Sequence, residues 1–323
     1  MKDVAYPLKF HPILKERIWG GDKLKSVLNM SIPSNNIGES WEISDVEGNS
    51  SIISNGSYKG NSLNEILIKL GPQLIGFKNY KIYKNQFPLL IKFIDAKEDL
   101  SVQLHPSNEL AMKRHNSYGK TEMWYVMQAD DEANLIVDFN REMSKEKYLN
   151  HLNSNTLTSV LNYVKVKKGE SYFIDVGRVH AIGAGVLLAE IQQTSDLTYR
   201  IYDWDRVDDA GKSRELHNEL AIDAIDFDMP ENYKIEYKRA KNTSNNMVKC
   251  PYFTTNYLEL NKPVKKINIF DSFIIYICLD GEASVETGTF TEPLKKGETV
   301  LIPACIKDFT IVSNSAKLLE VYV

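Results

Sequence analysis

The chain has 323 residues, of which 43% are apolar and 25% are charged, and its formal net charge is −4. This length allows two domains, and the composition is that of a globular protein in water. The slight acidic excess argues against general nucleic-acid binding, which needs a basic surface, whereas a small phosphorylated molecule needs only a few local basic groups.

Targeting signals and disulfides are not indicated. Residues 1–10 lack the charged-then-apolar pattern of a secretory signal, and the longest apolar run, 273–279, is far shorter than the roughly 18 residues of a membrane span. Cys250, Cys278 and Cys305 are widely spaced, which fits neither a disulfide framework nor a cysteine zinc site. We therefore expect a cytoplasmic protein with no membrane partner.

Short β-prone runs separated by turn residues dominate the chain. They are predicted at residues 87–94, 123–128, 134–138, 171–175, 186–192, 253–260, 272–279, 284–286 and 299–303. Helical patterns are fewer and are predicted at 62–70, 107–115, 144–161 and 215–225, with Ser62 and Ser107 as plausible caps. This spacing favours a sandwich or barrel with small helical insertions over alternating βαβ units.

Two parts of the chain resemble each other. Residues 167–175 and 295–303 both read as a turn glycine, a strand and a turn, and the earlier run 124–127 matches 275–278. Two related barrels in one chain explain this near-repeat, although two hairpins of ordinary composition can also resemble each other by chance.

In that alignment, potential ligands in the first unit stand opposite other residue types in the second. The aligned pairs are Glu122 with Phe273, Gly177 with Cys305, and His180 with Asp308. This predicts one active barrel and one structural barrel.

A polar stretch divides the two units. Residues 232–246 are rich in Asn, Lys and Arg and read as a linker. We therefore predict an N-terminal catalytic domain over 1–231 and a C-terminal, non-catalytic domain over 247–323.

Four side chains have the chemistry of a metal site. Gln103 and His105 share one face of a predicted strand, Glu122 begins the next strand, and His180 follows a turn. Two imidazoles, one carboxylate and one amide oxygen suit Zn²⁺ with a position open to water or substrate. The other histidines have no comparable setting and read as structural or exposed.

The motifs around these residues resemble a known family. The run 169–180 resembles the second cupin motif. Further segments are similar to the zinc-binding motifs and N-terminal signatures of the type I mannose-6-phosphate isomerases, namely 100–106, 119–124, 179–182, 17–21 and 38–42. The resemblance extends over roughly residues 10–210, with the motifs in the family's order.

The resemblance implies a mainly β fold of two cupin-type jelly-roll barrels with small helical insertions. It implies that Gln103, His105, Glu122 and His180 bind one zinc ion. It also implies an isomerase that interconverts mannose 6-phosphate and fructose 6-phosphate, with Arg200 as its active-site arginine.

Such an isomerase moves a proton between C2 and C1 through an enediol, so it needs a base and a positive group. The Arg200 guanidinium stays charged and can meet two oxygens, although it could instead pair with nearby Asp196, Asp203 or Asp205.

Two further residues are candidates for proton transfer. Glu190 lies on an otherwise apolar strand, where a carboxylate is costly unless paired or functional, so it is either the base or a partner that orients a histidine or arginine. Lys120, two residues before Glu122, could transfer a proton or hold a substrate oxygen, unless it is an ordinary surface lysine.

The phosphate and hydroxyls need anchors as well. Ser101 faces the same way as Gln103, and Lys92 lies in an apolar strand, so both are predicted substrate-binding residues. No glycine-rich nucleotide loop is present, so neither ATP nor NAD is suggested.

Two other functions remain open at this stage. A regulatory cupin that binds sugar phosphates would need no base, and the presence of Arg200, Glu190 and Lys120 favours the enzyme. A cupin oxidoreductase using Fe or Mn usually presents paired histidines, where this chain has Gln103. The expected assembly is a monomer or a homodimer.

Overall fold

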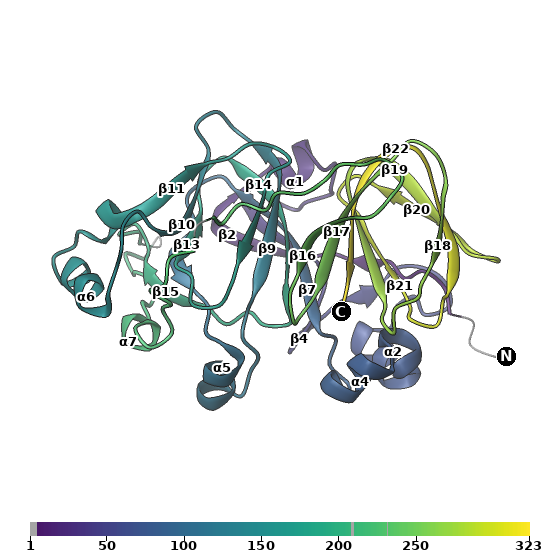
Figure 1. Ribbon diagram of the computed structural model, residues 1–323, viewed down its shortest axis with the longest axis horizontal. Coiled ribbons are helices and arrows are strands. Elements are labelled where there is room, and N and C mark those ends of the chain that lie inside the picture. Colours follow the sequence, from purple (N-terminus) through teal and green to yellow (C-terminus); the bar gives the residue numbers. More distant parts are fainter. Residues whose placement is uncertain (1–4, 208–209, 231) are drawn as a thin grey trace.

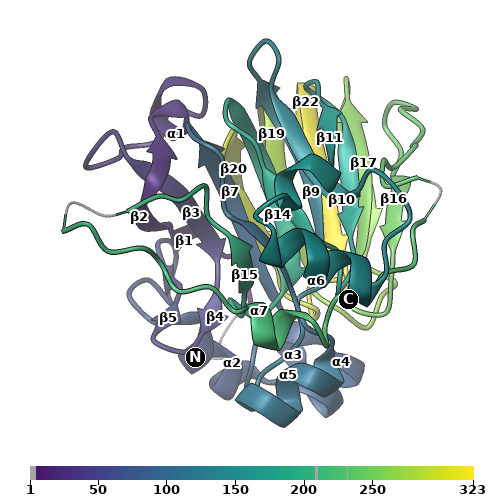
Figure 2. The same ribbon diagram turned by 90° about the vertical axis from the view of Figure 1, so that its left-hand side faces the viewer.

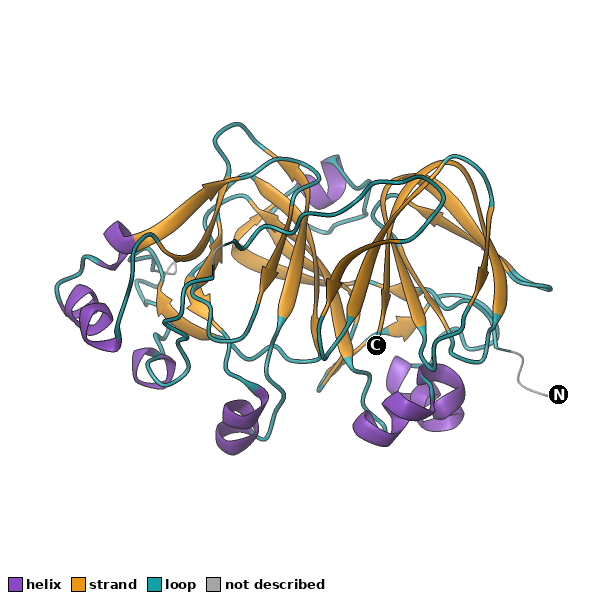
Figure 3. Ribbon diagram, viewed as in Figure 1, coloured by secondary structure: helices purple, strands orange, loops and turns teal. Residues whose placement is uncertain are grey.

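The computed structural model describes residues 5–207, 210–230 and 232–323. The chain is mainly β and forms two barrels with short helices on the outside, which confirms the predicted fold class (Figures 1 and 3). Residues 1–4 and the predicted domain end at residue 231 lie outside the described part. No described helix is long and apolar enough to cross a membrane.

The first barrel consists of two facing sheets. In the described residues, six strands form one sheet in the order β12 (Ser171–Ile174), β9 (Glu122–Ala129), β14 (Val186–Gln193), β7 (Leu89–Ala96), β2 (Ile13–Gly21) and β3 (Ile37–Ile43). Five described strands form the other, in the order β11 (Leu161–Lys165), β10 (Asn134–Phe139), β13 (His180–Ile182), β8 (Val102–Leu104) and β15 (Tyr199–Tyr202).

The second barrel is built on a related strand order. Its described strands are β16 (Asn245–Lys249), β17 (Thr254–Leu260), β18 (Val264–Ile267), β19 (Ile274–Glu286), β20 (Thr291–Lys295), β21 (Thr299–Ile302) and β22 (Asp308–Tyr322). The order β21–β19–β22–β17 in this barrel parallels β12–β9–β14–β7 in the first. Two short pairs lie outside both barrels, β1 (Phe10–His11) with β6 (Ile52–Ile53) and β4 (Asp45–Val46) with β5 (Asn49–Ser50).

The internal alignment needs a correction of one residue. Trp124 pairs with Tyr172 across β9 and β12, and Tyr276 pairs with Val300 across β19 and β21. Because Tyr172 and Val300 occupy the same place in the repeat, Trp124 corresponds to Tyr276, and Glu122 therefore corresponds to Ile274, not Phe273. A shift of one residue moves a strand side chain to the opposite face, so it decides which residue points into the barrel.

The helices predicted at 62–70 and 107–115 are present, and the structure adds short helices that were not predicted. The described helices are α1 (Lys23–Ser26), α2 (Leu63–Leu70), α3 (Pro72–Ile75), α4 (Phe77–Tyr83), α5 (Asn108–His115), α6 (Lys145–Asn153), η1 (Leu157–Val160) and α7 (Asn218–Ala221). Ser62 and Glu65 form a capping box on α2, and the Ser107 side chain caps α5. The stretch 144–161, where one or two helical turns are predicted, contains α6 and η1, separated by a turn in which Asn155 adopts φ 55°. The helix predicted over 215–225 is only α7, which no side chain caps.

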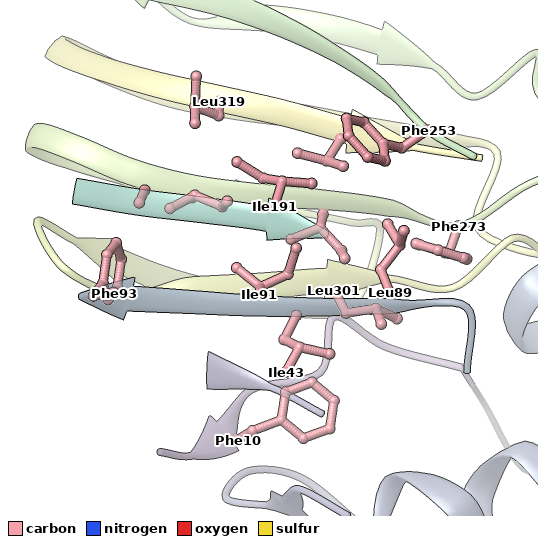
Figure 4. Close-up of a cluster of buried hydrophobic side chains, with 14 of the residues drawn as sticks. Phe10, Ile43, Leu89, Ile91, Phe93, Ile191, Phe253, Phe273, Leu301 and Leu319 are labelled. Carbon is pink, nitrogen blue, oxygen red and sulfur yellow. The ribbon is translucent and has the colours of Figure 1, made fainter. Parts of the chain in front are cut away.

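The two barrels share one hydrophobic core. The faces of β7, β9 and β14 that point away from the first barrel's interior pack against β17, β19 and β22. Figure 4 shows Ile91, Phe93 and Ile191 of the first barrel in one cluster with Phe273 and Leu319 of the second. On the other side, α6 and α7 cover the outer face of the five-stranded sheet (Figure 2). The predicted role of residues 232–246 as a linker between two domains stays a prediction.

The strand registers place two rows of polar side chains on the facing sheets. In the six-stranded sheet, neighbouring positions are Trp41, Lys92, Glu190 and Trp124. In the five-stranded sheet, neighbouring positions are His180, Gln103 and Arg200. Residues far apart in the sequence therefore meet in the first barrel.

Candidate active site

Three of the predicted metal ligands converge. One nitrogen of His105, one carboxylate oxygen of Glu122 and one nitrogen of His180 all lie within 4.8 Å of one another, and all three residues are buried. Glu122 opens β9 and His180 opens β13, while His105 directly follows β8. The group could hold a metal ion.

Backbone carbonyls orient both imidazoles toward this group. His105 Nδ1 lies 2.8 Å from the Leu197 carbonyl oxygen, and His180 Nδ1 lies 2.8 Å from the Arg178 carbonyl oxygen. Because a carbonyl only accepts, each Nδ1 carries the proton and each Nε2 keeps its lone pair for a ligand. The Nε2 atoms of His105 and His180 approach the Glu122 carboxylate to 3.6 Å and 3.5 Å.

The chemistry of these groups fits a cation. Burial lowers the pKa of His105 well below its usual range and that of His180 to about 4, so both rings are neutral near pH 7. Within the described residues, His105 Nε2 and Glu122 Oε1 are buried without a hydrogen-bond partner. Unsatisfied buried acceptors are costly, and a metal ion at this point would satisfy them.

Gln103 lies at the edge of the group. Its Nε2 is 3.5 Å from His180 Nε2, and its Oε1 accepts a hydrogen bond of 3.3 Å from the Ser101 hydroxyl. A half-turn of the amide would exchange these two atoms and present the oxygen to the group.

Glu190 is buried in the opposite sheet and has charged partners. Its Oε2 accepts a 2.9 Å hydrogen bond from Trp124 Nε1, and its Oε1 lies 3.2 Å from Lys92 Nζ and 3.8 Å from Lys120 Nζ. Burial alone would raise the pKa of Glu190, but Lys120 and Lys92 lower it below its ordinary value. The carboxylate is therefore ionised.

Lys120 is a buried residue, so it is not the surface lysine that the sequence left open. Only 4% of it is exposed, and its Nζ lies 3.0 Å from Glu122 Oε2. Burial lowers its pKa, but Glu122 and Glu190 more than compensate and raise it above the usual value, which keeps the ammonium protonated.

Within the described residues, Arg200 forms no ion pair with Asp196, Asp203 or Asp205. Its Nε donates to the Ser101 hydroxyl at 3.2 Å and its Nη1 donates to the Glu215 carbonyl at 2.9 Å. Asp203 is instead taken by Arg206 and Arg214. The pKa of Arg200 is lowered by burial and by the nearby Arg214, yet a guanidinium of this kind stays charged.

A cavity of about 530 Å³ joins these groups. All predicted site residues line it except His105 and Glu122, which are buried, Glu122 beside the lining residues His180 and Lys120. Its volume suits a small molecule. Three of the other histidines have partners away from this group, since His115 hydrogen-bonds Tyr199, His151 hydrogen-bonds Thr156 and His217 accepts from the Arg200 backbone.

Several residues that line the cavity had no predicted role. Arg17 Nη2 and Trp41 Nε1 both donate to Glu39 Oε2, at 2.9 Å and 2.8 Å, and the Trp41 ring lies within 5.1 Å of Lys92. Gly38 makes room for Arg17 and for the neighbouring Trp19 ring, because a Cβ there would lie 2.7 Å from Arg17 Cβ and 2.5 Å from the Trp19 ring. The N-terminal signatures 17–21 and 38–42 were the signal that could have identified these residues.

Comparisons with known proteins cover nearly the whole chain. The family described as phosphomannose isomerase type I, catalytic domain, matches residues 8–141, and that described as mannose-6-phosphate isomerase, cupin domain, matches residues 243–323. The chain is 35% identical to mannose-6-phosphate isomerase ManA of Bacillus subtilis over 94% of this chain and 95% of that protein. It is 34% identical to the mannose-6-phosphate isomerase of Streptococcus mutans over 95% of both chains. The crystal structure of a Bacillus subtilis mannose 6-phosphate isomerase superposes with a TM-score of 0.88 at 33% identity, covering 98% of this chain and 99% of that one.

Proposed function

The chain belongs to the type I phosphomannose isomerase family, and from that premise we propose that it interconverts mannose 6-phosphate and fructose 6-phosphate. The observation that carries the proposal is the ionised Glu190 carboxylate, which lines a cavity beside protonated Lys120 and the buried His105, Glu122 and His180 group. A module that only bound the sugar phosphate would have no need of a buried base.

We propose that the metal is zinc and that His105, Glu122, His180 and Gln103 hold it. Two neutral imidazoles, a carboxylate and an amide oxygen are a donor set that suits zinc and leaves room for another ligand. A zinc ion bound there would supply a Lewis acid that polarises oxygens of the sugar.

Side chains that line the cavity carry out the remaining steps. Glu190 takes the proton from C2 of the open-chain aldose and returns it to C1, while a hydroxyl proton moves from O2 to O1, so the product is the ketose. The Lys120 ammonium donates hydrogen bonds to these oxygens as their charge changes. Arg200, whose charge is permanent, stabilises the enediolate from the opposite sheet.

Ser101 and Lys92 are the proposed substrate-binding residues. Ser101 accepts from Arg200 and donates to Gln103, so it is placed to contact an oxygen between them. Lys92 pairs with Glu190 on the same row and would meet a hydroxyl next to the reacting carbons. Such contacts with non-reacting atoms orient C1 and C2.

We further propose that the first 231 residues carry the catalysis and that residues 247–323 form a structural barrel joined by the 232–246 linker. The cavity and the possible metal group lie in the first barrel, which supports this division. A cytoplasmic monomer or homodimer without nucleic-acid or membrane partners fits the net charge of −4.

The test is a coupled assay with mannose 6-phosphate on the purified protein, run in parallel with glucose 6-phosphate. Turnover of the mannose ester alone is expected. Tight binding of mannose 6-phosphate without turnover would replace the isomerase with a regulatory sugar-phosphate-binding protein.

A further inference from the structure

Glu190 is held from one side by an indole. Trp124 on β9 stands directly opposite Glu190 on β14, and its Nε1 donates to Oε2 of the carboxylate at 2.9 Å. Both residues are at least 98% buried, with exposed fractions of 1% and 2%. A hydrogen bond between two groups so deeply buried is strong, so it fixes one oxygen of the carboxylate.

The second barrel contains the corresponding pair. Tyr276 on β19 stands opposite Glu320 on β22, and the Tyr276 hydroxyl donates to Glu320 Oε2 at 2.7 Å. The neighbouring position on the far side of the glutamate is Lys92 in the first barrel and Asn256 in the second. The two barrels therefore share a row in which an aromatic donor holds a buried glutamate.

Glu190 and Glu320 differ in the donors that reach their two carboxylate oxygens. In Glu320, Oε1 accepts from Ser244 and Asn256, and Oε2 accepts from Lys266 as well as Tyr276. All these bonds are between 2.6 Å and 3.0 Å, so both oxygens of Glu320 are fully occupied.

Among the residues that the structure describes, a neutral donor approaches Glu190 closely only at Oε2. Oε1 has lysine ammonium groups at 3.2 Å and 3.8 Å, and Glu190 lines the cavity. The first barrel thus fixes one oxygen with a neutral donor and pairs the other only with two lysines that line the cavity, whereas the second barrel has neutral donors on both oxygens.

We infer that Trp124 is a positioning residue for the isomerisation: its indole N–H holds Oε2 of Glu190 so that Oε1 alone faces the reacting carbons. The inference rests on the proposed function, because it gives Glu190 the role of the base. A carboxylate that is free to rotate would spend part of its time in orientations that cannot reach both C1 and C2.

The Trp124 ring has a second contact that the test must separate from the N–H. It packs edge-on against the His180 imidazole, with ring centroids 5.4 Å apart and an interplanar angle of 76°. Loss of the whole ring would disturb a possible metal ligand, so a small residue at this position would not be informative.

The experiment compares Trp124→Phe with Trp124→Tyr in the full-length protein loaded with zinc. Phenylalanine keeps an aromatic ring and removes the donor, and tyrosine restores a donor of the kind that the second barrel uses at the same place. The matched control is Tyr276→Phe, which removes the equivalent hydrogen bond from the second barrel, away from the residues that line the cavity. The readouts are kcat, KM for mannose 6-phosphate and zinc content.

We expect Trp124→Phe to lower kcat by roughly 10- to 100-fold, the usual effect of losing a hydrogen bond to a charged group, with KM changed less than about threefold. Trp124→Tyr should regain most of that loss, and Tyr276→Phe should keep the kcat of the wild type. Zinc content should stay stoichiometric in all three variants.

Three results would overturn the inference. They are a Trp124→Phe variant with normal kcat, a Trp124→Tyr variant no better than Trp124→Phe, and a loss of kcat that follows loss of zinc. An inactive wild-type protein would instead refute the proposed function itself, so the two failures are distinguishable.

Discussion

Replacing Glu190 with glutamine should destabilise the first barrel strongly, because it leaves a lysine buried without its counter-charge. The side chains of Lys92 and Glu190 are 5% and 3% exposed, and Lys92 Nζ lies 3.2 Å from Glu190 Oε1. In the described residues this carboxylate is the only acid within ion-pair distance of Lys92, whereas Lys120 also has Glu122.

The loss of stability is expected to be large because, among the described residues, Lys92 has no second acid within ion-pair distance. Removing one member of a buried ion pair typically costs about 3–5 kcal/mol of the free energy of unfolding, because the remaining charge has lost its partner but stays away from water. Removing both charges costs much less, so Glu190→Gln combined with Lys92→Met should recover at least half of the loss.

Urea unfolding of the zinc-loaded protein, followed by fluorescence and circular dichroism, measures these differences. At a slope of about 3 kcal/mol per molar urea, the midpoint should fall by about 1 M or more in Glu190→Gln. The control is Lys165→Gln, which breaks the exposed ion pair with Glu132 and should change stability by less than about 1 kcal/mol. A Glu190→Gln variant that is as stable as this control would refute the reasoning.

Three other changes should separate metal binding, catalysis and pH dependence. His180→Ala should lose both zinc and turnover, and zinc at full stoichiometry, measured by plasma mass spectrometry, would argue against its role as a ligand. Arg200→Ala should keep zinc but raise the barrier by roughly 2–4 kcal/mol in steady-state kinetics, as loss of an oxyanion donor does, and near-normal turnover would remove it from the mechanism. Burial raises the pKa of Glu42 to about 8 in the folded protein. The nearby Glu298 charge also raises this pKa, and the Lys9 charge lowers it without offsetting the burial. The Glu42 carboxyl is therefore protonated at neutral pH. Folding then binds a proton, and stability should decline as the pH rises from about 4.5 to about 8. Glu42→Gln should flatten this decline in thermal melts, and an unchanged pH profile would contradict it.

The sequence predicted the elements whose signals are local. The predicted caps at Ser62 and Ser107 mark two helices correctly, because the cap and the helix it starts are neighbours in the chain. The two barrels were also predictable, since strand spacing and the repeated glycine turns survive in both halves. The register of the repeat was not, because a one-residue ambiguity between Phe273 and Ile274 is resolved only by pairing with β21.

In the candidate site, too, some features could be predicted from the sequence and others could not. The side chains of His105, Glu122 and His180 could be selected from motifs in a fixed order, and the structure brings these three together. The N-terminal signatures marked residues 17–21 and 38–42, but not the role of their side chains. The pairing of β3 with β7 and the hydrogen bond from Arg17 to Glu39 become visible only in the structure.

The hydrogen bonding of Glu320 in the second barrel could not be predicted from the sequence either. Glu320 and Tyr276 are far apart in the chain, and nothing in the spacing indicates that they face each other. The long strand β22 in the structure corresponds to two shorter strands, β13 and β14, of the first barrel, so an alignment by strand length would not have paired Glu320 with Glu190.

The central claim is that side chains from β9, β13 and the end of β8 act together on one divalent cation. Its most direct test is turnover of mannose 6-phosphate by the wild-type protein before and after exhaustive chelation, with zinc then added back. Activity should disappear with the metal and return at one equivalent of zinc per chain. Undiminished turnover by protein free of metal would contradict the account.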